Sequence, residues 1–119
     1  MNNLCTDIGW MSLNKKGEQL CGDHVDIVPQ GENSTVVVLA DGMGGHPDGE
    51  VAAQIALQVV STLFQQKAKP MLEEPALFLE EALLHAHRQI LRYASTKGMM
   101  DTPRTTLVAA VLQDGKVTW

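Results

Sequence analysis

The chain has 119 residues, 45% of them apolar, which is enough for one hydrophobic core and too little for two. Its 9 basic and 14 acidic residues give a net charge of −5, and no stripe of Lys and Arg could hold a nucleic-acid backbone. The strongest apolar run, residues 35–40, is far shorter than the roughly 20 residues that cross a bilayer. We therefore expect one domain, or part of one, with neither a nucleic-acid nor a membrane partner.

Two cysteines, Cys5 and Cys21, are present. Residues 1–11 lack the basic start and apolar block of an export signal. Two cysteines in a chain without such a signal are usually free thiols in a reducing compartment. We therefore expect a cytoplasmic location.

The first elements along the chain are short strands. Residues 7–13 would place Ile8, Trp10 and Ser12 on one side and Gly9, Met11 and Leu13 on the other and predict a strand, and residues 14–17 supply a turn. Residues 24–28 alternate again and predict a second strand that ends at Pro29. The polar residues 30–34 fit a hairpin loop.

Residues 35–40 form an unbroken β-branched and aliphatic run, which predicts a central strand buried on both faces. A glycine-rich stretch follows, and then an amphipathic helix over residues 49–66, with Asp48 as cap or dipole partner near its start. The apolar positions that recur at helical spacing are Val51, Ala52, Ile55, Ala56, Val59 and Leu63.

A second helix is predicted to begin with Pro75 in its first turn and to close at Lys97 and Gly98. The apolar residues expected to share one of its faces are Leu79, Leu83, Ala86, Ile90 and Tyr93.

Residues 105–112 are another β-type run, and the Asp114-Gly115 pair favours a tight hairpin into a returning strand at residues 117–119. That last strand is too short to satisfy its partner, so we expect the domain to continue beyond it. The order of strands, two helices and strands predicts an α+β fold that is truncated, with two long antiparallel helices.

The stretch from Asp41 to Glu50 is the best candidate for a functional site. An aspartate at the end of a buried strand is costly unless a positive or hydrogen-bonding group faces it, and the adjacent glycines let backbone atoms approach an ion closely. A hard divalent cation meets both needs. The alternative is that the glycines only shape a tight turn. No Gly-Lys-Ser/Thr or Gly-x-Gly-x-x-Gly pattern is present, so a nucleotide cofactor is not expected.

The sequence Val-Leu-Ala-Asp-Gly-Met-Gly-Gly-His at residues 38–46, followed by Gly49-Glu50, resembles the Asp-Gly motif of bacterial protein phosphatase 2C enzymes. Gly22-Asp23 and the Thr-Thr-Leu-Val-Ala-Ala run at residues 105–110 are similar to further elements of that family in the same order. The resemblance extends over nearly all of residues 1–119 and implies the N-terminal part of a single α/β/β/α sandwich domain, with its C-terminal strands and helices missing.

What the resemblance implies for chemistry is hydrolysis of phosphoserine and phosphothreonine in proteins by a water activated between two Mg²⁺ or Mn²⁺ ions. Carried over by position, Asp41 would bridge the metals and be the catalytic residue, the carbonyl of Gly42 would bind one metal, and Asp23 would serve the other. The partners implied are a phosphorylated protein substrate and a cognate serine/threonine kinase or its targets. The family's later aspartates would lie beyond Trp119, so the 119 residues alone are expected to be inactive.

The sequence also departs from the family. Glu18 stands where a phosphate-binding Arg is expected and Cys21 replaces an Asn, leaving Lys15 or Lys16 as weaker substitutes. This departure keeps a second reading open, a non-catalytic regulatory or interaction module on a phosphatase-like scaffold. A third reading is a metal-independent α+β binding domain. The oligomeric state is not fixed by the sequence.

Overall fold

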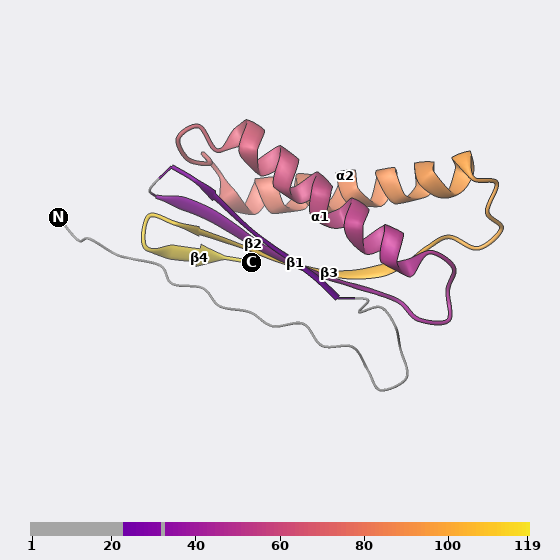
Figure 1. The fold of residues 1–119 in the computed structure, drawn as a ribbon. Helices are drawn as coiled ribbons and strands as arrows, with labels where there is room; N and C mark the ends of the chain where they lie inside the picture. The colour runs from indigo at the N-terminus through magenta and orange to yellow at the C-terminus, as the bar shows by residue number, and fades with distance from the viewer. Residues whose placement is uncertain (1–22, 32) are drawn as a thin grey trace.

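The computed structural model describes residues 23–31 and 33–119 (Figure 1). The elements follow the order β1 (Asp23–Gln30), β2 (Ser34–Gly42), α1 (Gly49–Lys67), α2 (Pro75–Thr96), β3 (Thr105–Gln113) and β4 (Lys116–Thr118). The strand predicted at residues 7–13 lies outside the described residues. No helix in the described ranges is long and apolar enough to span a membrane.

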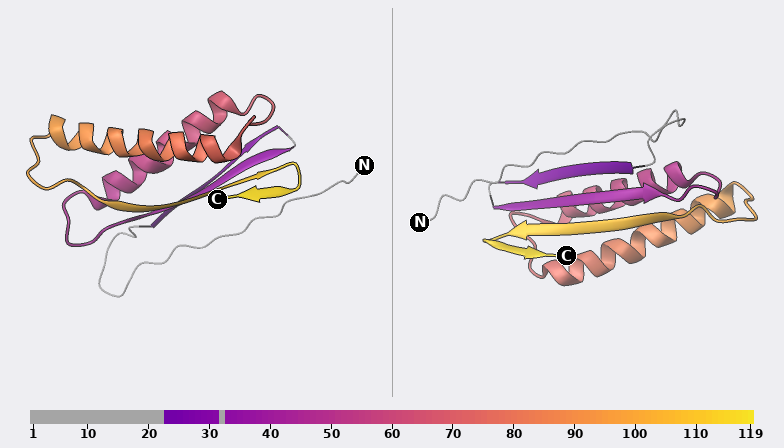
Figure 2. Two further views of the ribbon diagram at one scale, coloured as in Figure 1. Left: turned by 180° about the vertical axis from the view of Figure 1, so that it is seen from behind. Right: turned by 90° about the horizontal axis from the view of Figure 1, so that it is seen from below.

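The four strands form one antiparallel sheet in the order β1-β2-β3-β4. Both helices lie on the same face of this sheet, as the front and back views show (Figures 1 and 2). The α+β class predicted from the sequence is therefore confirmed, and the described part is compatible with a truncated protein phosphatase fold.

Strand β2 is buried on one face only, so the prediction that it is covered on both faces is wrong for the described structure. Val36, Val38 and Ala40 are fully buried beneath the helices, whereas the intervening Leu39 is 41% exposed. An unbroken apolar run does not say which face a neighbouring layer covers, because both faces of the strand are apolar. The helices supply one layer, and the opposite face of the sheet is open in the described part.

Strand β1 continues through Pro29 to Gln30, two residues beyond the predicted end. Pro29 pairs in register with Thr35 of β2. Proline cannot donate a hydrogen bond to a sheet, but it is tolerated where the strand has a neighbour on one side only. Because β1 is the outermost described strand, its proline does not end it.

Helix α2 begins at Pro75, as predicted, and buries a stripe of apolar residues, three of them alanines: Phe78, Ala82, Ala86, Ile90 and Ala94. Leu83, predicted to share the core face, is 55% exposed. The buried positions recur every four residues, slightly more than one helical turn, so the buried stripe shifts gradually around the helix and does not include Leu83. Alanines at these positions allow α2 to approach α1 and the sheet closely.

The core joins the helices to the sheet through a few large side chains. Phe64 of α1 and Phe78 of α2 meet edge to face with ring centroids 5.8 Å apart, above Val36, Val38 and Val111. The hairpin predicted at Asp114-Gly115 is confirmed, with positive φ of 53° and 71° at the two residues, as a type I′ turn requires.

Candidate metal centre at the end of strand β2

The candidate site begins where β2 leaves the sheet. Asp41 is exposed and directly follows the fully buried Ala40, so it lies on the face of the sheet opposite the helices. Its main-chain N–H donates a hydrogen bond of 3.2 Å to Oγ1 of Thr106 in β3. The end of β2 is therefore held in place by its neighbour while the Asp41 side chain faces solvent.

Three strands contribute one row of residues at this end of the sheet. The register pairs Asp23 of β1 with Asp41, and Asp41 with Thr106 of β3. Residues directly opposite each other in an antiparallel ladder have Cβ atoms about 4.5–5.5 Å apart. Asp23 and Asp41, predicted as site residues but 18 positions apart in the sequence, are thus direct cross-strand neighbours in the backbone.

The backbone of Gly42 lies against the first turn of α1, at Gly49. A Cβ atom built on Gly42 would overlap the carbonyl group of Gly49 and lie 2.8 Å from the nitrogen of Glu50. A Cβ atom built on Gly49 would lie 2.7 Å from the carbonyl oxygen of Met43. Both glycines are therefore required for the strand end and the helix start to approach so closely.

Asp48 is the N-cap residue of α1 but makes no side-chain capping hydrogen bond, so of its two predicted roles, cap or dipole partner, the side-chain cap is not formed. It adopts the left-handed conformation with φ of 55°, and its Oδ2 accepts a 2.8 Å hydrogen bond from the hydroxyl of Tyr93 in α2. This hydrogen bond raises the pKa of Tyr93 above 10.0, with desolvation and the charge of Asp48 acting in the same direction. No local sequence pattern indicates this contact, since Tyr93 was predicted to share the apolar face of the helix.

The other end of the loop is fastened to the segment before β3. His46 Nδ1 lies 3.1 Å from Oδ2 of Asp101, whose Oδ1 is 3.9 Å from Nη2 of Arg104. The N–H of Met43 donates a 2.9 Å hydrogen bond to the carbonyl of Arg104. Loop residues 42–49 are thus tied both to α2 and to the segment before β3.

The donors at the end of β2 are oxygens: the exposed carboxylate of Asp41 and the main-chain carbonyls of the glycine loop, with the backbone of Asp23 in register one strand away. Oxygen ligands suit Mg²⁺ and Mn²⁺, and Mg²⁺ is commonly held by one or two carboxylates together with water. Within the described ranges no three His, Cys, Asp or Glu side chains form a metal-binding group. The residues present fit one side of a divalent-cation site.

Several residues considered in the sequence, Glu18, Cys21, Lys15 and Lys16, lie outside the described residues.

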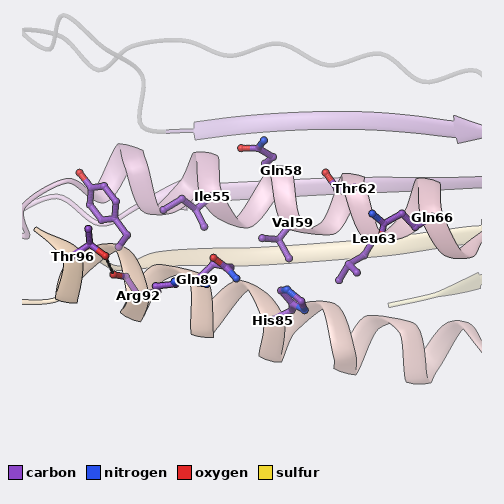
Figure 3. A pocket seen from close by; sticks show the side chains of 11 residues that line it. Ile55, Gln58, Val59, Thr62, Leu63, Gln66, His85, Gln89, Arg92 and Thr96 are labelled. Atoms are coloured by element: carbon purple, nitrogen blue, oxygen red, sulfur yellow. Dashed lines mark hydrogen bonds between the residues drawn. The ribbon is translucent and has the colours of Figure 1, made fainter.

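A groove of about 710 Å³ lies elsewhere, between α1 and α2 (Figure 3). Val59 and Leu63 of α1 and His85 and Gln89 of α2 line it. The groove lies on the helix side of the sheet, whereas Asp41 lies on the other side. It is not part of the candidate metal centre.

Comparison with known proteins defines the class to which this fold and loop belong. Residues 14–119 match the sequence profile of protein phosphatase 2C, and the chain belongs to that family. It is 30% identical over 96 residues to a serine/threonine phosphatase stp of Listeria welshimeri serovar 6b. The corresponding proteins of Listeria monocytogenes serovar 1/2a and Listeria innocua serovar 6a are 29% and 28% identical over the same length. Each match covers 80% of this chain and 38% of the relative, so the chain spans well under half the length of these relatives.

Proposed function

We propose that the chain is the N-terminal part of a single phosphatase domain that hydrolyses phosphoserine and phosphothreonine in proteins with a metal-activated water. The observation that carries the proposal is the pairing of Asp23 with Asp41 beside Gly42, at the solvent-facing end of β2. Family membership over residues 14–119 supports the reaction class.

In this proposal Asp41, Asp23 and the main-chain carbonyl of Gly42 would hold two Mg²⁺ or Mn²⁺ ions, with Asp41 serving both ions, Gly42 one of them and Asp23 the other. Such ions, when bound, acidify a water for attack on phosphorus and offset the charge on the phosphoryl oxygens. Asp41 is suited to hold charge at a fixed point because its own main-chain N–H is bound to Thr106. The close contact between Gly42 and Gly49 likewise restricts the backbone that carries the Gly42 carbonyl.

The substrate class in the proposal is a phosphorylated protein, because the relatives are named serine/threonine phosphatases. A cognate serine/threonine kinase, or the targets of that kinase, would be the functional partner. A cytoplasmic location belongs to the same proposal.

The test is hydrolysis of a phosphothreonine peptide by the full-length protein, with and without Mn²⁺, compared with its Asp41→Asn variant. Asparagine keeps the size of the side chain and removes its charge, so turnover should fall by about 100-fold or more. Chelation of the metal should abolish turnover, and added Mn²⁺ should restore it.

The matched control is Asp114→Asn in the β3–β4 hairpin. The substitution removes the same charge at a left-handed position that asparagine tolerates. Asp114 lies at the opposite end of the strands from Asp41. Turnover should be unchanged in this variant. If the full-length protein releases no phosphate with any divalent metal, the phosphatase proposal is wrong and the regulatory-module alternative replaces it.

A further inference from the structure

The groove between α1 and α2 has an apolar wall that comes from α1. Ile55, Val59 and Leu63 form this wall, and all three side chains are half-buried. They recur every four residues, so they lie along one side of the helix over a length of about 12 Å. Figure 3 shows Val59 and Leu63 pointing from α1 toward α2.

The opposite wall comes from α2 and is polar. It contains His85, Gln89 and Arg92, at a spacing of four and three residues that places them on one side of the helix. His85 and Gln89 point toward α1, with His85 near Leu63 and Arg92 toward the end where Ile55 lies (Figure 3). His85 and Arg92 are seven residues apart, which is about 10 Å along the helix axis. The imidazole, amide and guanidinium groups all supply N–H donors to the groove.

The charge of the groove differs from that of the chain. The chain has a net charge of −5, yet none of the described residues that line the groove is Asp or Glu. Within the described ranges the guanidinium of Arg92 forms no ion pair. The carboxylate of Asp48, near the same end, accepts a hydrogen bond from Tyr93 instead. A guanidinium binds a carboxylate or phosphate in a charge-assisted hydrogen bond, so the groove favours an anionic ligand.

We propose that this groove binds a small, elongated organic acid, whose acidic group lies on Arg92 and whose apolar body lies against Val59 and Leu63. The groove volume of about 710 Å³ is within the range of about 300–1,000 Å³ that is typical of small-molecule sites. The inference does not depend on the phosphatase activity proposed above, because Asp41 lies on the other side of the sheet from the helices.

A small molecule fits the groove better than a helix of another protein. The polar wall from His85 to Arg92 extends over two helical turns, whereas helices shorter than about 12–15 residues are marginally stable on their own. Grooves that bind helices are apolar, because they cover the apolar face of an amphipathic helix. Here one wall consists of hydrogen-bond donors, which suits the polar edge of a small acid.

The experiment uses 4-phenylbutyrate as the probe and its neutral amide, 4-phenylbutanamide, as the matched control ligand. Each is titrated into the metal-free full-length protein and followed by the NMR shifts of backbone amides. Omitting metal prevents the carboxylate from binding to ions at the candidate metal centre. The acid should bind with a Kd of about 1 mM and shift the amides of Val59 and Gln89. The amide should bind about fivefold more weakly, because it lacks the charge that pairs with Arg92.

Substitutions in the two walls should have different effects. In Arg92→Gln the preference for the acid over the amide should disappear. In Val59→Thr, which keeps the shape of the side chain and adds a hydroxyl, both ligands should bind about threefold more weakly. Arg88→Gln is the control, since Arg88 is an exposed arginine of the same helix that does not line the groove, and it should keep the fivefold preference. Thermal unfolding checks that all three variants are folded.

Four results would overturn the proposal. They are no binding of the acid up to about 10 mM, equal binding of acid and amide, shifts confined to amides outside the groove, and equal effects of Arg92→Gln and Arg88→Gln.

Discussion

At Gly42 a single hydrogen atom in place of a side chain lets the end of β2 reach α1. Gly42→Ala should destabilise the full-length protein by about 1–3 kcal/mol, because the new methyl group overlaps the carbonyl of Gly49 and forces strand and helix apart. Urea unfolding without added metal is the measurement, so that any loss of metal binding does not contribute.

Gly44→Ala is the control for Gly42→Ala, because the added methyl group has no neighbour within 4 Å and the residue does not need positive φ. Its free energy of unfolding should change by less than about 0.5 kcal/mol. Equal effects of the two substitutions would show that the contact between Gly42 and Gly49 does not restrict the backbone.

The sequence was sufficient to single out Asp41 and Gly42 but not their surroundings. An aspartate followed by glycines at the end of an apolar run is visible in one short window. The contacts of that window with Thr106, Tyr93 and Asp101 join residues that are 45 to 65 positions apart. Such contacts depend on sheet register and helix rotation, which no local pattern encodes. For the same reason the pairing of Asp23 with Asp41 appears only once β1 and β2 are in register.

At the scale of elements, Tyr93 ties α2 to the start of α1 through Asp48, and this link depends on pH. The raised pKa means that the folded protein holds the phenolic proton more tightly than the unfolded chain. The stabilisation is complete below pH 10.0 and is lost as pH rises through the higher folded-state pKa. Asp48→Asn should move the pKa of Tyr93 down toward 10.0, because the charge of the acceptor is gone.

The phenolate absorbance of the full-length protein minus that of its Tyr93→Phe variant isolates the titration of this one residue. Asp101→Asn is the control, since Asp101 is a carboxylate at the same loop that contacts His46 instead. An unchanged pKa in Asp48→Asn, or an equal shift in Asp101→Asn, would contradict the assignment of the shift to the hydrogen bond.

The elements themselves were largely predictable, and the errors share one cause. Helix α1 was expected at residues 49–66 and ends one residue later, and both helices begin where glycine or proline signals placed them. The one-sided burial of β2, the passage of β1 through Pro29 and the exposure of Leu83 were missed. Each depends on which neighbouring layer is present, and hydrophobic periodicity describes an element without its neighbours.

At the scale of the whole molecule, the candidate site borders an apolar sheet surface. Next to the row of Asp23, Asp41 and Thr106 comes the row of Val25, Leu39 and Val108. Leu39 is 41% exposed and Val108 58%, although both belong to central strands of the described sheet. An apolar face of this kind is a surface on which further structure packs. Asp41 would then lie at the edge of the covered part of the sheet rather than on an open surface.

The last prediction concerns residues 1–119 as an isolated polypeptide. Turnover of a phosphothreonine peptide with Mn²⁺ should be lower than that of the full-length protein by on the order of 100-fold or more, because no three His, Cys, Asp or Glu side chains of its described residues form a metal-binding group. Binding of a dye that fluoresces on apolar surface should be stronger per molecule, since Leu39 and Val108 are exposed. Circular dichroism must first show that the polypeptide keeps its helices. Phosphate release at the full-length rate by a folded 119-residue chain would mean that its own residues complete the site, and the assignment of Asp23, Asp41 and Gly42 as only part of the ligand set would be wrong.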